Sequence, residues 1–427
     1  MLGKARTRIY QLLRRSEKHT KTDMVYLAKG GFWLILSQII SSLSSLVMVI
    51  AFANLISAEL YGSYRYVISI IGVLLAATFP GINSMAIKSV ANEDDATFWL
   101  LVRKKALWSL ASTGLGLLLS LYYAINHNGE LALVFVIASA AIPLSVTAGM
   151  YSSFLNGRKD FRKLAQWSTL VKLIVVISFV VLLPFIKSLA LLFLVYFIPE
   201  LVIEGLLLLT LYRKDQKRGQ IQVEIKKLSR FSLHLSLMEA IKTIAGQIDK
   251  VLIFHYLGAA QLAIYTIATS APGQIKGILQ NLSTLAWPKF SSTKEESIRA
   301  TLPAKLFKLE LIILGCVAIY WIVAPFLFPI FFPKYANAVF LSQIFSLSLL
   351  FFPRTFLSTA MTAHLKQKEM YAIRILAPLA RIAVFAIALP FWGLWGAIIG
   401  SIISNVLTTT IYQFFFRKAF PSQPESA

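Results

Sequence analysis

Cysteine and charge are what this sequence has least of. The chain of 427 residues contains a single cysteine, Cys316, which excludes an intramolecular disulfide and a thiolate metal cluster. Its five histidines show none of the spacings typical of zinc-binding motifs. Charged residues make up 14% of the chain, against roughly 25% in a soluble domain. We therefore expect neither a metal centre nor an ordinary soluble domain.

Hydrophobic residues take the place of the missing charge. They account for 57% of the chain, and the mean hydropathy is +0.70. Apolar runs of about 20 residues recur along the sequence, and a helix of that length crosses the roughly 30 Å hydrocarbon core of a bilayer. This predicts an all-α integral membrane protein. Charged residues, glycine and proline divide the runs into twelve predicted spans, near residues 28–54, 62–90, 100–124, 130–156, 163–186, 188–212, 231–256, 261–288, 303–330, 336–364, 367–390 and 392–416.

The connections between these spans alternate in charge. Of the 42 lysines and arginines, 32 lie in or beside the N-terminal segment and every second connection, and two lie in the other connections. Because cytoplasmic loops carry such an excess, we expect both termini in the cytoplasm. Residues 1–27 are basic and lack an apolar core, so we interpret them as an amphipathic segment and not a signal peptide. The net charge of +23 follows from this topology and requires no nucleic-acid partner.

Two halves of six spans each are expected. "ISAELYGSY" at 56–64 is matched 201 residues later by "LGAAQLAIY" at 257–265. Six spans per half give both halves the same orientation, which is typical of a parallel repeat in a transporter. The predicted parts are an N-terminal six-helix bundle (28–212), a basic cytoplasmic linker (213–230), a C-terminal six-helix bundle (231–416) and a cytoplasmic tail (417–427).

Thirteen charged residues lie inside the predicted spans. The basic ones are Arg65, Lys172, Lys242, Lys250, Lys276, Arg354, Arg374 and Arg381, and the acidic ones are Glu200, Glu204, Glu239, Asp249 and Glu310. Each would cost on the order of 2.5–3.5 kcal/mol at the centre of a lipid-facing helix, so most must face protein, water or one another. A long side chain near a helix end can instead extend to the interface. We apply that explanation to Lys250 and leave it open for Lys276, Arg65 and Arg374.

Lys172 and Arg381 lie too deep in their spans for this explanation. The 209-residue offset that aligns Lys159 with Lys368 also aligns Lys172 with Arg381. We expect these two residues, with Arg354, to line a shared cleft between the halves. Internal ion pairing is the alternative.

The acidic residues allow two interpretations. Glu239, Lys242 and Asp249 share one face of the seventh span. Glu239 and Asp249 could carry a proton or sodium ion or act in gating, or they could pair with neighbouring cations. Glu200 and Glu204 are one turn apart, and we expect them to neutralise Lys172. The surplus of three positive charges inside the spans suits an anionic passenger.

The chain resembles the polysaccharide and O-antigen flippases of the multidrug, oligosaccharidyl-lipid and polysaccharide (MOP) exporter superfamily. The stretches that carry this resemblance are "ISAELYGSY" (56–64), "QIDKVLIFHYLGAAQLAIYTIA" (247–268) and "GLWGAIIGSIISN" (393–405), within twelve spans divided into six and six. It implies two six-helix bundles around a central cavity that opens alternately to each side of the bacterial inner membrane. The implied passenger is an undecaprenyl-diphosphate-linked oligosaccharide, moved from the cytoplasmic to the periplasmic leaflet.

The resemblance also implies a binding site. The cationic cavity of the family would correspond to Lys172, Arg354, Arg374 and Arg381, with Lys242 as a further candidate, and arginine offers a forked donor to a diphosphate. The protein would be a transporter and not an enzyme, without a cofactor. Coupling to a proton or sodium gradient stays open. Its partners would be the lipid-linked oligosaccharide, the bilayer and polysaccharide assembly proteins.

Three alternatives remain. A flippase for the lipid-linked peptidoglycan precursor shares the fold, although fourteen spans are often expected there. A multidrug antiporter shares it too, but its passengers are usually cations. A membrane polymerase or ligase would need a sizeable periplasmic loop and paired carboxylates. Glu59 and Glu130 stand alone in short outer connections.

Overall fold

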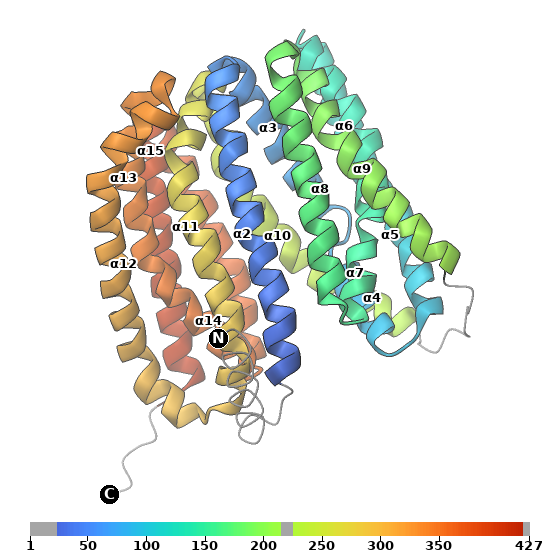
Figure 1. The fold of residues 1–427 in the computed structure, drawn as a ribbon. Coiled ribbons are helices and arrows are strands. Elements are labelled where there is room, and N and C mark those ends of the chain that lie inside the picture. Colours follow the sequence, from blue (N-terminus) through green and yellow to red (C-terminus); the bar gives the residue numbers. More distant parts are fainter. Residues whose placement is uncertain (1–23, 215–224, 422–427) are drawn as a thin grey trace, which may run out of the picture.

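The computed structural model describes residues 24–214 and 225–421, and all of the regular structure in these residues is helical. The helices form two lobes that lie side by side (Figure 1). The N-terminal lobe contains α2 (Met24–Leu55), α3 (Ala58–Ala76), α4 (Gly81–Ala91), α5 (Asp95–Ile125), α6 (Gly129–Ala148), α7 (Met150–Gly157), α8 (Phe161–Leu182), η1 (Leu183–Phe185) and α9 (Leu189–Lys214). The C-terminal lobe contains α10 (Ile225–Leu257), α11 (Ala259–Ser292), α12 (Glu295–Phe331), η2 (Pro333–Ala338), α13 (Val339–Ser346), η3 (Leu347–Arg354), α14 (Thr355–Ala363) and α15 (Gln367–Ala419).

Short polar residues begin the helices of the N-terminal lobe. The side chains of Ser57, Asp94, Asn128 and Asp160 each accept a hydrogen bond from the backbone N–H three residues later. Such capping satisfies a donor that the first turn leaves free. The connections before α3, α5, α6 and α8 can therefore be short.

Helix α15 is too long for one crossing. Its 53 residues would extend about 80 Å, more than twice the hydrocarbon thickness. The chain turns at Gly393, whose φ of 54° and ψ of −134° are accessible to glycine and not to other residues. A Cβ atom on Gly396 would lie 2.1 Å from the carbonyl oxygen of Ala388, which shows how closely the two arms pack. The turn separates the predicted spans 367–390 and 392–416.

The second predicted span is also broken. Helices α3 and α4 meet at an angle of 60° around residues 77–80. In the part of the chain that the structure describes, eight helices are long and apolar enough to cross a membrane, or nine if this bent pair counts as one. Helices α10 and α11 have 33 and 34 residues but are more polar, and α15 crosses twice. The helix order is thus consistent with the twelve predicted spans.

Some predicted boundaries differ from the observed ones. Helix α10 begins at Ile225, inside the predicted linker 213–230, and residues 215–224 lie outside the described chain, as do 1–23 and 422–427. Helix α5 begins at Asp95, before the predicted span 100–124, and contains Lys105. Its side chain is buried, and Nζ donates to Thr78 Oγ1 (3.4 Å) and the Phe79 carbonyl (3.5 Å). Lys105 therefore stabilises the break between α3 and α4.

Apolar packing differs between the two ends of the molecule. We call the end where α2 begins and α15 ends the terminal end, and the opposite end the far end (Figure 1). At the far end, one apolar cluster joins residues of both lobes, such as Phe52 and Phe179 with Leu262 and Phe328. At the terminal end each lobe has a cluster of its own. The lobes therefore share an apolar cluster at the far end, whereas toward the terminal end their apolar clusters are separate and the contact is between α4 and α10, where the Gly81 N–H donates to Ser236 Oγ at 3.0 Å.

Candidate functional site

The lobes meet where α3 lies against α10 and α11. Gly62 permits the closest approach, since a Cβ atom there would lie 1.8 Å from the carbonyl oxygen of Ala259. One turn further along α3, the ring of Tyr66 stacks on Phe254 of α10 at a centroid distance of 3.9 Å. The next residues toward the terminal end are charged, so an apolar seal lies directly above a polar layer.

Asp249 on α10 forms the centre of this polar layer. Its side chain is only 5% exposed. The hydroxyl of Tyr265 on α11 donates to Asp249 Oδ2 at 2.8 Å, and Arg381 Nη2 on α15 lies 3.4 Å from the same oxygen. Lys250 Nζ lies 3.5 Å from Oδ1. Three helices of the C-terminal lobe therefore contribute to one buried ionic group.

Two further cations act on this group. Lys276 on α11 interacts electrostatically with Arg381 and Asp249, and Arg65 on α3 interacts with Lys250. We call the six residues Arg65, Asp249, Lys250, Tyr265, Lys276 and Arg381 the interlobe charge cluster. It contains four cations and one carboxylate, and of the cations Lys250 and Arg381 pair directly with Asp249. A buried surplus of positive charge is costly unless an anion compensates it.

The interface explanation for Lys250 is wrong. Its Nζ donates to the Gly246 carbonyl (3.5 Å) and Gln247 Oε1 (3.2 Å), so the side chain extends back along α10 toward the membrane interior. The adjacent Asp249 was the available signal, because a buried carboxylate attracts neighbouring cations. For Tyr265 the signal was the repeat, because the 201-residue offset aligns it with Tyr64 and both tyrosines are buried.

Lys172 lies in the N-terminal lobe, on α8. It interacts electrostatically with Glu200 on α9, which in turn acts on Glu204. The neutralisation of Lys172 by Glu200 and Glu204 stays a prediction. Arg65 and Glu200 both interact electrostatically with Tyr196 of α9. Arg65 thus connects this smaller group to the interlobe charge cluster.

Arg354 lies elsewhere. It forms a two-pronged pair with Glu310 on α12, in which Nη2 donates to Oε2 at 2.8 Å and Nε donates to Oε1. The elements that pack most closely on η3 all belong to the C-terminal lobe. For Arg354 the structure thus supplies the ion pair that was the alternative to a place in a shared cleft.

The remaining candidates lie on the contact between α10 and α15 or beside it. Arg374 Nη1 lies 3.6 Å from Met238 Sδ, and its side chain is exposed. Lys242 Nζ donates to Glu239 Oε1 at 2.9 Å, and both side chains are largely exposed. Glu239 therefore pairs with its own helix neighbour, while Asp249 is held across three helices. A central cavity at these residues stays a prediction.

Comparison with protein families identifies the family of this chain. A family model described as "Polysaccharide biosynthesis protein" matches residues 27–294, which is more than half of the sequence. The chain belongs to this family. The match and the fold together confirm the resemblance to the MOP superfamily. No curated protein sequence matches the chain significantly.

Solved structures share the two-lobed fold. The lipid II flippase MurJ in an inward closed conformation matches with a TM-score of 0.61 at 14% identity, over 92% of this chain and 90% of that one. A MOP superfamily transporter from Pyrococcus furiosus matches with a TM-score of 0.57 at 13% identity, over 92% and 95%. An outward-facing multidrug resistance MATE transporter gives 0.55 at 14%, over 91% and 95%. At these identities the likeness establishes the fold alone, with helices of two lobes around a central axis.

Proposed function

We propose that this protein is a flippase for an undecaprenyl-diphosphate-linked oligosaccharide, which it moves from the cytoplasmic to the periplasmic leaflet of the bacterial inner membrane. The terminal end would face the cytoplasm. Membership of a polysaccharide biosynthesis family supports this passenger. The observation that carries the proposal is the interlobe charge cluster, in which Asp249 is paired with Lys250 and Arg381 and two further cations, Arg65 and Lys276, lie within electrostatic range of the group.

A diphosphate complements this cluster in charge and in geometry. Arg381 and Arg65 can each donate two parallel hydrogen bonds to a phosphate, and Lys250 and Lys276 add point charges. The incoming anion would compete with Asp249 for Arg381, whose bond to Asp249 at 3.4 Å is long for an ion pair. The oligosaccharide would lie between the lobes, and the prenyl chain would stay in the bilayer.

The far-end seal suits one step of alternating access. The lobes share an apolar cluster at the far end but not at the terminal end, so entry of a passenger from the cytoplasm would require only the contact between α4 and α10 to open. Release would require the contact between Gly62 and Ala259 to open. Asp249 is the candidate carrier of a coupling proton or sodium ion, because passenger binding would free it from Arg381.

The charge of the headgroup distinguishes lipid diphosphates from cationic passengers, but it does not distinguish one lipid diphosphate from another. The lipid-linked peptidoglycan precursor carries the same diphosphate, so the cluster favours both lipids over the cationic passengers of multidrug antiporters. The name of one structural neighbour, the lipid II flippase MurJ, keeps that precursor as the second candidate. Competition between the two lipids in one assay would separate these functions.

The test is a flipping assay with purified protein in liposomes and a fluorescent lipid-diphosphate oligosaccharide. Flipping should be slowed about tenfold or more by each of the variants Arg381→Gln, Lys276→Gln and Arg65→Gln. Each variant removes a charge-assisted hydrogen bond to the diphosphate. Arg381→Lys should recover part of the rate. Lys187→Gln changes an exposed lysine at the far end and is the matched control. Wild-type rates in all three cluster variants would refute the assignment.

A further inference from the structure

A second group of arginines lies at the terminal end of the C-terminal lobe. Arg299 comes from the first turns of α12, Arg354 from the end of η3, and Arg417 from the last turn of α15. They line a hollow of about 400 Å³ together with Pro303, Leu357, Gln413, Phe416 and Phe420. We call this hollow the terminal arginine pocket. Its volume is within the roughly 300–1,000 Å³ typical of ligand sites.

The pocket is both preorganised and positively charged. The two-pronged pair with Glu310 fixes the guanidinium of Arg354 and uses two of its five N–H donors. Arg299 and Arg417 are exposed at its edge. Three guanidinium groups against one carboxylate leave a surplus of positive charge on a surface that also offers the Gln413 amide. Such an arrangement suits a phosphate group.

The length of α12 places the pocket near the membrane surface. The helix has 37 residues, or about 55 Å, which exceeds the hydrocarbon core by roughly 25 Å. Its apolar part lies toward the far end, so Arg299 and Pro303 project beyond the hydrocarbon. Arg417 follows Gly393 by 24 residues, about 36 Å along the second arm of α15. All three arginines are therefore expected near the level of lipid headgroups.

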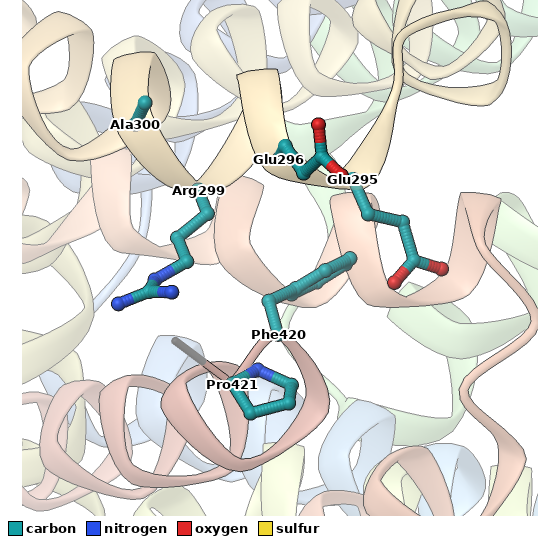
Figure 2. A pocket seen from close by; sticks show the side chains of 6 residues that line it. All are labelled: Glu295, Glu296, Arg299, Ala300, Phe420 and Pro421. Carbon is teal, nitrogen blue, oxygen red and sulfur yellow. The ribbon is translucent and has the colours of Figure 1, made fainter. Parts of the chain in front are cut away.

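Apolar side chains continue from the pocket toward the hydrocarbon. Phe307 lies one turn beyond Pro303 on α12 and is 56% exposed, and Phe414 lies one turn before Arg417 and is 62% exposed. Figure 2 shows the neighbouring hollow, which shares Arg299 and Phe420 but contains Glu295 and Glu296. In this view Arg299 and Glu295 lie on opposite sides of Phe420. The acidic residues restrict an anion to the side of Arg354 and Arg417.

We propose that the terminal arginine pocket binds the phosphate of an anionic phospholipid, whose acyl chains lie along Phe307 and Phe414. Basic pockets between membrane helices bind lipid headgroups in this way. The bound lipid would connect α12, η3 and α15 at the end where the C-terminal lobe has an apolar cluster of its own. This site is distinct from the interlobe charge cluster and does not depend on which passenger is carried.

The experiment measures lipid binding to the full chain by native mass spectrometry. The probes are dioctanoyl phosphatidic acid, dioctanoyl phosphatidylcholine and inorganic phosphate. Arg299→Gln and Arg417→Gln should each weaken phosphatidic acid binding about fivefold, and the double variant about 25-fold. Both residues are exposed, so the variants keep the pair between Arg354 and Glu310. Lys308→Gln is the matched control, since residue 308 lies on the same helix on the face opposite Arg299.

Each outcome decides the proposal. Preference for phosphatidic acid over both other probes, lost in the double variant and kept in Lys308→Gln, supports it. Equal binding of inorganic phosphate would make this a site for a free anion, and the lipid assignment would be wrong. Unchanged phosphatidic acid binding in the double variant would remove the site altogether. Because no outcome depends on flipping, failure here leaves the proposed transport function untouched.

Discussion

The two lobes have related topologies but hold charge differently. Of the thirteen charged residues in the predicted spans, the N-terminal lobe has two basic and two acidic, and the C-terminal lobe has six basic and three acidic. The whole surplus of positive charge thus belongs to the C-terminal lobe. In the N-terminal lobe, Lys172 and Glu200 act on each other electrostatically, whereas Asp249 pairs with both Lys250 and Arg381. We therefore expect the anion site in the C-terminal lobe and a mainly structural role for the N-terminal lobe.

Removal of one acid from each ionic group tests this comparison most strongly. Asp249→Asn should lower the free energy of unfolding by about 3–5 kcal/mol, because it leaves buried cations without their counter-charge. Glu200→Gln removes the partner of only one lysine and should cost clearly less. Thermal unfolding of both variants in detergent gives the order. A larger loss in Glu200→Gln would reverse the roles assigned to the lobes.

The contact between the lobes gives the next effect. Gly62→Ala would place a methyl group 1.8 Å from the Ala259 carbonyl, so the lobes must separate locally. Overpacking of this kind costs about 1–3 kcal/mol and should lower the unfolding temperature. Gly114→Ala, on α5, meets no atom within 4 Å and is the control. Equal stability of the two variants would show that α3 and α11 do not pack as described.

A smaller effect is expected within the N-terminal lobe. Lys105→Met removes the donor to the Thr78 hydroxyl and the Phe79 carbonyl at the break between α3 and α4 while keeping a long side chain. Both hydrogen bonds are long, so we expect a loss of about 1 kcal/mol in unfolding free energy. The exposed Arg103, two residues earlier, provides the control Arg103→Met. A neutral Lys105→Met variant would mean that the break needs no such support.

The smallest effect is expected at the exposed pair of α10. Lys242→Gln separates Lys242 from Glu239, and exposed pairs at this helical spacing contribute about 0.2–0.5 kcal/mol. Unfolding should therefore be nearly unchanged. Flipping assays on this variant also separate a stability effect from a transport effect. A strong transport defect with normal stability would indicate that Lys242 belongs to the anion-binding site.

Much of the architecture followed from the sequence. Apolar run lengths and basic connections predicted the span order and the division into halves, because bilayer thickness restricts helix length so strictly. The break at 77–80 contains Pro80, and a proline inside an apolar span marks a possible kink, although the sequence does not give its angle of 60°. The turn at Gly393 lay at a predicted boundary.

Less of the interlobe charge cluster could be predicted from the sequence. Arg381 and Asp249 were both identified, but their contact joins α10 and α15 through tertiary packing that spacing alone does not reveal. Lys250 was misread because its distance from a helix end says nothing of the direction in which Nζ points. Arg354 was expected in the cleft because its partner, Glu310, lies 44 residues away. Pairing across helices decides where a charge belongs.

The most direct measurement compares two lipids that differ only in charge. Purified protein should bind undecaprenyl diphosphate well and undecaprenol weakly, and added salt should reduce the difference. Arg381→Gln should bring the diphosphate lipid close to the neutral one, while Lys187→Gln leaves the preference intact. Equal binding of both lipids by the wild-type chain, or an undiminished preference in Arg381→Gln, would contradict the interlobe charge cluster as the anion site.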